Sequence, residues 1–238
     1  MDDSLLGALL CFLADDKKRN AALLSSGYQG SAYLYEADGI RLVVKEAGGG
    51  LFLGWFHRLM LRREARVYAM LRDVEGVPHS PGFIDNRYLV LEFVDGRSLK
   101  EERGDLQDQE AFYKTLHKII SDFHAAGVAH GDLKRKDNVL VDRDEQPHVI
   151  DFGAAVIRDG NWFDRFMFPL VVRFDFNAWI KVKYHRDFSA ISEQDQQWYQ
   201  PAVVEDMFRL LRRFWRTITF RQARNRRRKR RNSGARKP

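Results

Sequence analysis

Short segments separated by turn residues predict a sheet and one helix in the first half of the chain. Residues 31–36 and 40–44 are predicted to pair as a hairpin, because Ala37-Asp38-Gly39 between them is a typical tight-turn sequence. Residues 55–72 are predicted to form a helix, and residues 87–93 a further strand. This half is therefore expected to be rich in β-structure.

An amphipathic helix opens the second half. Its apolar side chains recur at spacings of three and four residues, which places them on one face of an α-helix, and Gly127 follows where a C-terminal cap belongs. Short apolar strands are predicted over residues 139–141 and 148–150, and the aromatic-rich chain beyond Asp159 is predicted to be helical. The residues that define the amphipathic helix are Phe112, Leu116, Ile119, Ile120 and Phe123.

The composition predicts a folded protein and not a disordered chain. Of the 238 residues, 45% are hydrophobic, which is enough to bury a substantial core. Cys11 is the only cysteine, so neither an intrachain disulfide nor a cysteine-based zinc site can form. Residues 5–14 are apolar but too few to cross a bilayer, and the acidic flank before them is unlike a secretory signal. We interpret them as a leading helix packed on the body, with surface attachment as the alternative.

The net charge of +7 comes from the end of the chain. Residues 221–238 contain ten Lys and Arg and no acid, which leaves 30 basic and 33 acidic residues in the rest. This tail is predicted to be disordered, because like charges repel and nothing apolar anchors it. It would attract the phosphates of anionic lipids and of nucleic acids alike. No folded nucleic-acid-binding motif accompanies it, so no sequence-specific nucleic-acid partner is expected.

The parts needed for phosphoryl transfer occur in order along the chain. The reaction needs a backbone cradle for phosphates, a cation on them, acidic ligands for Mg²⁺ and a base that faces the acceptor. Residues 25–32 contain two glycines, which let the backbone approach a phosphate closely. Lys45 ends an apolar strand, and Glu64 on the following helix offers it a carboxylate partner. Taken singly, the two glycines are more typical of an ordinary turn, and Lys45 with Glu64 is more typical of a solvated strand end and helix face.

Two motifs in the second half decide the interpretation. Residues 130–138 read His-Gly-Asp-Leu-Lys-Arg-Lys-Asp-Asn, and residues 151–153 read Asp-Phe-Gly. In register with Lys45 and Glu64, they resemble the catalytic core of the protein-kinase-like superfamily. The resemblance implies an α+β, two-lobed protein-kinase-like fold with an antiparallel-sheet N-lobe and a reduced helical C-lobe. We expect an N-terminal helical extension, an N-lobe, a C-lobe and a basic tail over residues 1–24, 25–94, 95–220 and 221–238.

The resemblance also implies a role for each matching residue. Asp132 would orient the acceptor hydroxyl and accept its proton, while Lys134 would steady the transferring phosphoryl group. Asp151 and Asn138 would hold Mg²⁺ or Mn²⁺, since both metals prefer hard oxygen ligands. ATP would be bound by residues of the glycine-rich loop, the strand lysine with its partner, and the hinge, namely Ser25, Gly27, Gly30, Lys45, Glu64, Glu92 and Val94.

The spacing after Asp132 departs from the family pattern. The family's asparagine usually lies five residues after the catalytic aspartate, and here Asp137 occupies that position while Asn138 lies at the sixth. Asn138 leads directly into Val-Leu-Val-Asp, as the family's asparagine does. We therefore expect Asn138 to be the second metal ligand, with Asp137 as the alternative.

Three features separate the chain from ordinary protein kinases. Gly131 replaces the arginine that meets a phosphorylated activation loop. Residues 153–183 contain no Ser, Thr or Tyr, and no Ala-Pro-Glu motif follows. We expect a constitutively competent kinase with a shortened second lobe. Small lobes of this kind occur in the RIO-type kinases and in the lipopolysaccharide kinases of the Kdo and WaaP type, and the chain resembles both.

The sequence leaves three hypotheses for the function. The leading hypothesis is a lipopolysaccharide-kinase-like enzyme that transfers the ATP γ-phosphate to a sugar hydroxyl of a membrane glycolipid. The second is an atypical RIO-like Ser/Thr kinase acting on a protein hydroxyl, which Lys134 favours. The third is a nucleotide-binding pseudokinase scaffold. The expected location is cytoplasmic, with peripheral attachment to the inner face of the membrane as the alternative.

Residues 161–188 bear on the question of attachment. They interleave nine aromatic residues with Arg and Lys, a pattern typical of a helix that lies on anionic lipid. We interpret the segment instead as the apolar core of the second lobe with its basic residues outward. An anionic membrane surface, contacted through this segment and the basic tail, is the alternative partner.

Overall fold

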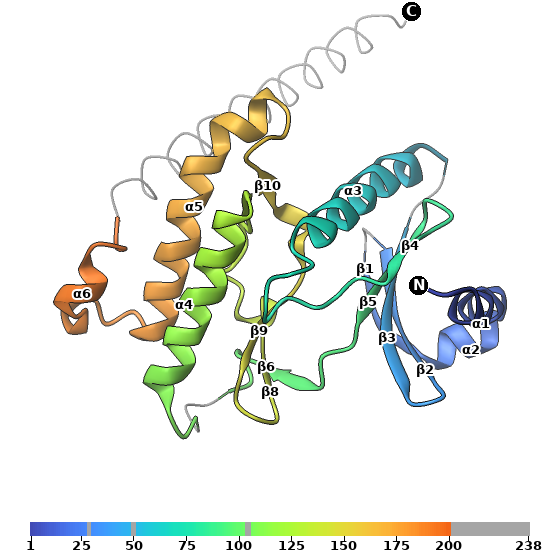
Figure 1. Cartoon of the computed structure of the whole chain (residues 1–238), viewed down its shortest axis with the longest axis horizontal. Helices are drawn as coiled ribbons and strands as arrows, with labels where there is room; N and C mark the ends of the chain where they lie inside the picture. The colour runs from blue at the N-terminus through green and yellow to red at the C-terminus, as the bar shows by residue number, and fades with distance from the viewer. Residues whose placement is uncertain (28–29, 49–50, 103–105, 201–238) are drawn as a thin grey trace, which may run out of the picture.

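The protein has two lobes joined by an extended segment (Figure 1). The computed structural model describes residues 1–27, 30–48, 51–102 and 106–200, and the basic tail predicted over 221–238 lies outside them. The first lobe is built on an antiparallel sheet, and the second on two long helices with short β-ladders. The division into the four ranges expected from the sequence remains a prediction.

Five antiparallel strands in the order β1-β2-β3-β5-β4 form the sheet of the first lobe. β2 and β3 pair from Gly30 opposite Ala47 to Ala37 opposite Ile40, which confirms the predicted hairpin. Its turn at Asp38-Gly39 has positive φ at both residues. The strands are β1 Leu23–Gly27, β2 Gly30–Ala37, β3 Ile40–Ala47, β4 Gly82–Ile84 and β5 Tyr88–Glu92.

Helices cover both faces of this sheet, and alternate side chains of a strand serve the two faces. Val44 and Val90 pack in one apolar cluster with α1 (Asp3–Ala14), whereas Leu91 packs in another with α3 (Leu51–Met70). This double covering explains why β5 is buried at four successive positions instead of at every second one.

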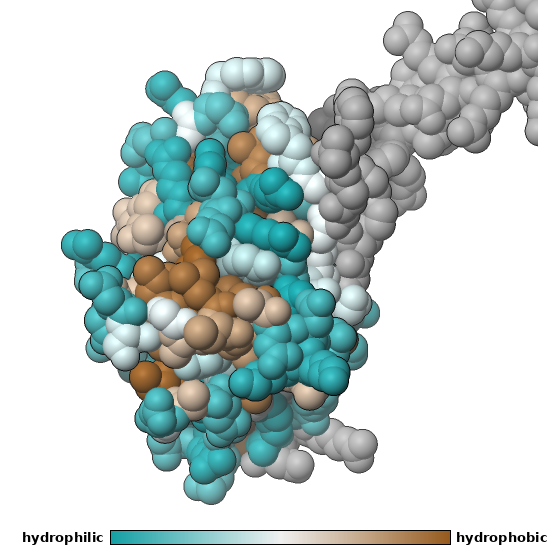
Figure 2. All heavy atoms as spheres, turned by 90° about the vertical axis from the view of Figure 1, so that its right-hand side faces the viewer, coloured by the Kyte–Doolittle hydropathy of each residue, from teal (hydrophilic) through white to brown (hydrophobic). Residues whose placement is uncertain are grey.

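The leading helix predicted for residues 5–14 is α1, which is followed by α2 (Asp16–Ala21). Leu9 and Leu13 are buried against the sheet, while Leu10 is exposed. Figure 2 faces this end of the molecule and shows an apolar band across the middle of a largely hydrophilic surface. The leading segment is therefore a part of the folded first lobe.

Helices α4 (Gln109–Ala125) and α5 (Trp162–Lys183) run side by side through the second lobe (Figure 1). The apolar residues predicted for the amphipathic helix are all buried in α4. One ladder combines β6 (Gly96–Ser98), β8 (Val139–Asp142) and β9 (Pro147–Val149), and a second combines β7 (Val128–Ala129) and β10 (Val156–Ile157). The remaining short elements are η1 Lys136–Asn138, η2 Phe152–Ala154, η3 Phe188–Ala190 and α6 Glu193–Gln196.

The aromatic-rich segment is divided between core and surface, so the interpretation of it as core holds only in part. Phe168, Phe176 and Trp179 of α5 are buried. The first turns of α5 differ, because Trp162 and Phe166 are exposed there. Within the described part of the chain, no helix has the length and apolarity needed to span a bilayer.

Candidate active site

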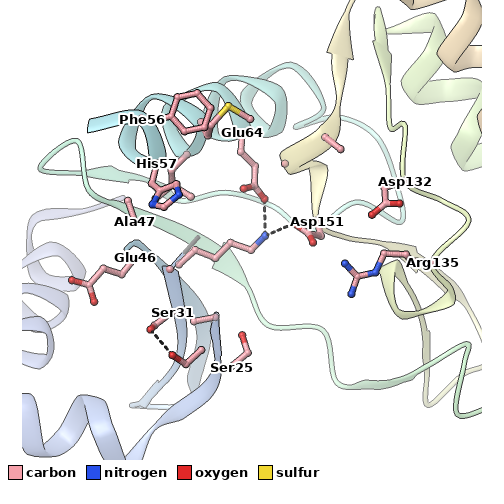
Figure 3. Close-up of a pocket in the computed structure, with 18 residues that line it drawn as sticks. Ser25, Ser31, Glu46, Ala47, Phe56, His57, Glu64, Asp132, Arg135 and Asp151 are labelled. Carbon is pink, nitrogen blue, oxygen red and sulfur yellow. Dashed lines mark hydrogen bonds and ion pairs between the residues drawn. The ribbon is translucent and has the colours of Figure 1, made fainter. Parts of the chain in front are cut away.

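A cavity of about 890 Å³ opens between the lobes, a size typical of small-molecule sites (Figure 3). The β1–β2 hairpin, strand β3 and helix α3 contribute its first-lobe side, and the segments around Asp132 and Asp151 contribute the other. Both carboxylates therefore face one cavity, which joint action on one phosphoryl group requires. Six residues predicted from the sequence line the cavity, namely Ser25, Gly30, Lys45, Glu64, Asp132 and Asp151.

Lys45 forms ion pairs with two of these carboxylates. Its Nζ lies 2.6 Å from Oε1 of Glu64 and 3.0 Å from Oδ1 of Asp151 (Figure 3). Lys45 belongs to a central strand, and Glu64 is a buried residue of α3, so regular secondary structure holds this pair. The carboxylate partner predicted for Lys45 is present.

The surroundings of Lys45 and Asp151 favour the charged form of both side chains. Burial alone would lower the pKa of Lys45, but the nearby carboxylates of Glu64 and Asp151 raise it above the usual lysine value. Burial alone would raise the pKa of Asp151, but the Lys45 ammonium outweighs burial and holds that pKa below the usual aspartate value. Asp151 is therefore ionised at neutral pH and suited to hold a cation.

Asn138 and Asp137 have different surroundings at the end of the catalytic loop. The short helix η1 accommodates the extra residue, and Asn138 is buried with its Nδ2 donating to the Asp132 carbonyl oxygen at 3.1 Å. This bond uses the amide nitrogen, so the amide oxygen is the atom that could face a metal. The Asp137 carboxylate instead pairs with Lys100, with Nζ and Oδ2 3.4 Å apart. Neither residue is among those that line the cavity, so Asn138 as the second metal ligand, with Asp137 as the alternative, remains a prediction.

Arg135 lies in the cavity where the sequence led us to expect Lys134. The Lys134 Nζ is 3.7 Å from Oδ1 of Asp132, but its side chain is largely exposed. Among the described residues, Arg135 is the cation that the catalytic loop contributes to the cavity lining. Its guanidinium extends into the space beside Asp151 (Figure 3). The consecutive Lys134-Arg135-Lys136 gave no sign of which side chain points inward.

Asp175 of α5 holds the backbone of the catalytic loop, and sequence reasoning missed it. Its Oδ2 accepts a hydrogen bond from the N–H of His130 at 2.7 Å and lies 3.0 Å from Nε2 of His124. Its Oδ1 accepts one from the N–H of Gly131 at 2.9 Å, and the carboxylate is fully buried. Such hydrogen bonds to an ionised acceptor are among the stronger ones in proteins.

The glycine before Asp132 has a geometric cause in this fold. Gly131 has a φ of +79°, a left-handed conformation that side chains disfavour, and an added Cβ would lie 3.1 Å from the Ala154 carbonyl oxygen. The arginine that ordinary protein kinases carry here would strain this backbone. The backbone conformation of the loop therefore requires a glycine at position 131, apart from any loss of the arginine's function.

Aromatic packing connects α3 with the catalytic loop. The ring of Phe152 packs against those of Tyr68 and His130, with centroid distances of 5.4 Å and 4.7 Å. The Tyr68 hydroxyl also accepts a hydrogen bond from the N–H of Asp151 at 3.2 Å. Asp151 has a left-handed φ of 65°, which is uncommon outside glycine and needs such support.

Replacing Tyr68 by Phe is expected to keep the ring packing and to remove this hydrogen bond. We expect the free energy of unfolding to fall by about 0.5–1.5 kcal/mol. We also expect kcat to fall while the KM for ATP changes little, because Asp151 is held less firmly and Lys45 is unchanged. Urea denaturation and steady-state kinetics measure the two effects. Tyr113→Phe is the control, because that hydroxyl bonds the Val182 carbonyl within the second lobe. An equal loss of kcat in the control would contradict the positioning role of Tyr68.

The predicted hinge residues Glu92 and Val94 do not line the larger cavity. Glu92 and Val94 line a second cavity of about 370 Å³. The Glu92 carboxylate accepts a hydrogen bond from the N–H of His79 at 3.3 Å. The larger cavity thus covers the phosphate end of the predicted site, and adenine binding by the hinge backbone remains a prediction.

The glycine-rich loop is described only at its base. Gly27 of β1 pairs with Gly30 of β2, and residues 28–29 at the predicted tip lie outside the described residues. A Cβ on Gly30 would come within 1.9 Å of the Glu46 carbonyl oxygen, so only glycine fits this close approach. In the predicted phosphate-binding loop, Gly30 is therefore required on steric grounds.

The donor set fits a metal ion that arrives with a nucleotide. The ionised Asp151 and the amide oxygen of Asn138 are hard oxygen ligands, which Mg²⁺ prefers. Within the described residues, no group of three or more His, Cys, Asp or Glu is arranged to hold a metal by itself. Mg²⁺ is commonly bound by one or two protein oxygens together with substrate phosphates. The site therefore fits Mg²⁺ carried by ATP better than a resident ion.

Known kinases share this fold. The family model of the RIO domain, RIO1, matches residues 56–167. Two crystal structures of the Rio2 kinase from Chaetomium thermophilum superimpose on the chain with a TM-score of 0.56 at 18% identity. The superposition covers 78% of this chain and 61% or 62% of theirs. The chain therefore has a protein-kinase-like fold, and its middle part is similar to the RIO domain. The two-lobed α+β fold expected from the sequence is confirmed.

Curated protein kinases match about two fifths of the chain. The chain is 34% identical over 106 residues to the hormonally up-regulated neu tumor-associated kinase of Homo sapiens. It is 31% identical over 105 residues to the serine/threonine-protein kinase PknE of Mycobacterium tuberculosis. These matches cover 40% and 41% of the chain but only 14% and 18% of the relatives. The RIO and Rio2 matches favour the RIO-like alternative, and the lipopolysaccharide-kinase hypothesis gains no support.

Proposed function

We propose that the protein is an ATP-dependent, RIO-like atypical kinase that phosphorylates a serine or threonine hydroxyl of a protein. The observation that carries the proposal is the convergence of Lys45, Asp132 and Asp151 on one cavity, with Glu64 paired to the lysine. The match to the RIO domain supports a protein acceptor over a glycolipid sugar. A pseudokinase scaffold is disfavoured, because the chain keeps the residues that the chemistry requires.

In the proposed reaction each side chain acts on a defined atom. Lys45 would leave its contact with Asp151 and bind oxygens of the α- and β-phosphates, with Glu64 keeping the ammonium in place. Asp151 and Asn138 would hold Mg²⁺, which would offset the charge of the phosphates. Asp132 would accept the proton of the acceptor hydroxyl as its oxygen bonds the γ-phosphorus and the bond from that phosphorus to the β–γ bridging oxygen breaks. ADP and the phosphorylated acceptor would be the products.

Arg135 adds a second cation to this scheme. Its guanidinium would face the oxygens of the transferring phosphoryl group from the side opposite Lys45. A cation fixed at the place where charge develops stabilises the transition state more than the ground state. We assign Arg135 this role in preference to Lys134, because Arg135 lines the cavity.

The test is phosphate transfer by the full-length chain. The purified protein would be incubated with Mg²⁺ and γ-labelled ATP, together with peptides that offer Ser, Thr or Tyr. We expect label on Ser or Thr peptides, and none with an Asp132→Asn variant purified in the same way. Label found only in a glycolipid fraction would overturn the protein-kinase proposal.

A hydroxylamine step makes this test sharper. One of the Rio2 structures is an ADP/Mg²⁺-phosphoaspartate complex. Label on this chain itself would therefore be treated with hydroxylamine, which cleaves an acyl phosphate and leaves phosphoserine and phosphothreonine intact. Hydroxylamine-sensitive label on the chain, without transfer to any peptide, would indicate a nucleotide hydrolase and would contradict the proposal.

A further inference from the structure

Helices α3 and α5 both carry large apolar side chains that are exposed. Trp55 and Leu59 of α3 are 68% and 47% exposed. Trp162 and Phe166 in the first turns of α5 are 79% and 73% exposed. Rings that project this far gain little from packing within the chain itself. Each lobe therefore carries an exposed apolar pair on one of its helices.

An ion pair joins the two helices. Arg63 follows Leu59 by one helical turn, and its Nη2 donates to Oδ1 of the buried Asp164 at 2.6 Å. The same nitrogen donates to the Ala155 carbonyl oxygen at 2.9 Å. Asp164 belongs to the first turns of α5, so the ion pair joins α3 to the part of α5 that carries Trp162 and Phe166. We call these four exposed residues, with the arginines described next, the α3–α5 surface.

Arginines flank the apolar residues of this surface. Arg58, Arg62 and Arg66 succeed one another at four-residue spacing, which places them along one face of α3. Arg62 donates to the amide oxygen of Asn86 at 2.7 Å, and no carboxylate of the described residues forms an ion pair with any of these three arginines. The one acid of α3, Glu64, is buried against Lys45. Positive charge on this face of α3 is therefore uncompensated.

We propose that the α3–α5 surface docks the protein on an anionic lipid bilayer. Tryptophan and phenylalanine settle at the level of lipid headgroups, and arginine beside them meets lipid phosphates. A protein partner would need a matching hollow for each projecting ring, whereas a bilayer deforms around them. The excess of arginine selects anionic lipids over neutral ones. This inference does not depend on the proposed kinase activity.

Docking would also place the cavity near the lipid. Phe56 and Met60 are the chain neighbours of Trp55 and Leu59, and both line the cavity between the lobes. One helix thus contributes to the docking surface and to the entrance of the cavity. A docked molecule would act on acceptors found at the membrane surface.

The experiment must separate this surface from the basic tail, which would itself bind anionic vesicles. The full-length chain would be mixed with vesicles of equal parts phosphatidylcholine and phosphatidylglycerol, with and without bromine on the acyl chains. Bromine quenches only tryptophans that insert. We expect quenching of the wild type, and loss of most of it in a Trp55→Phe, Trp162→Phe variant that still sediments with the vesicles.

Binding strength gives a second readout. We expect the pair Arg58→Gln and Arg62→Gln to weaken partition into these vesicles by about fivefold per arginine, since each contributes about 1 kcal/mol near an anionic surface. The pair Trp162→Ser and Phe166→Ser should weaken it further. Phe188→Ser is the matched control, because Phe188 is also exposed but lies in η3, outside the α3–α5 surface. Circular dichroism would verify that every variant is folded.

Three outcomes would overturn the proposal. Sedimentation without quenching, or quenching that persists in the Trp55→Phe, Trp162→Phe variant, would mean that the tail alone binds the membrane. Binding to poly-glutamate that needs the same arginines and tryptophans, without insertion into vesicles, would assign the surface to an acidic protein instead.

Discussion

Phosphoryl transfer is expected to fall by about 10²–10⁴-fold when Asp132 is replaced by Asn, the range that general-base catalysis contributes. The amide cannot accept the proton of the acceptor hydroxyl, so kcat should fall. Lys45 and Glu64 remain paired, so the KM for ATP should change little. Steady-state kinetics with the best peptide acceptor would measure both constants.

Asp137→Asn is the matched control, because it makes the same chemical change in the same loop. The Asp137 carboxylate pairs with Lys100, with 3.4 Å between Nζ and Oδ2, and Asn138 is the residue that bonds the Asp132 backbone. We expect near-normal activity from this variant and a weaker response to Mg²⁺ from Asn138→Ala. Equal losses from Asp132→Asn and Asp137→Asn would show that the roles in this loop are assigned wrongly.

Replacing Asp175 by Ala is expected to cost at least about 3 kcal/mol in the free energy of unfolding. The carboxylate accepts hydrogen bonds from the N–H groups of His130 and Gly131 and lies 3.0 Å from the His124 ring. Each buried polar group left unsatisfied costs about 1–3 kcal/mol. Chemical denaturation measures the loss, and activity should fall with it because the loop that carries Asp132 is no longer fixed.

Asp122→Ala is the comparison for Asp175→Ala. Asp122 pairs with Lys118 at 2.7 Å on the exposed side of α4. Exposed ion pairs contribute about 0–1 kcal/mol, so this variant should be close to the wild type in stability. Similar stability losses in the two variants would contradict the structural role given to Asp175.

Local patterns in the sequence predicted most of the elements near the site. The hairpin of β2 and β3 has a turn that favours glycine, and α4 has an apolar face at helical spacing, so each is encoded within a few residues. The motif around Asp132 and the Asp-Phe-Gly motif predicted two of the carboxylates that line the cavity, those of Asp132 and Asp151. The other four predicted residues that line the cavity come from the glycine-rich loop, strand β3 and helix α3.

The remaining features depend on contacts between distant parts of the chain. Asp175 bonds the backbone of His130 and Gly131, and nothing near Asp175 in the sequence indicates that partner. Which of Lys134 and Arg135 points inward depends on how the loop packs. The acceptor was the hardest to predict, because its recognition rests on exposed surfaces that the motifs do not encode.

Arg63 couples the position of α3 to the second lobe, so we expect the contacts of Arg63 and of Glu64 to form or break together. The residue beside Glu64 in the sequence donates to Ala155 and to Asp164 in the other lobe. A movement of α3 that separated Glu64 from Lys45 would also break the two hydrogen bonds of Arg63. Contacts to β3 and to the second lobe therefore hold the helix together. Residues 153–183 contain no Ser, Thr or Tyr that could be phosphorylated to switch the kinase on. We therefore expect the kinase activity in a cell to depend on the amount of the protein and on its location.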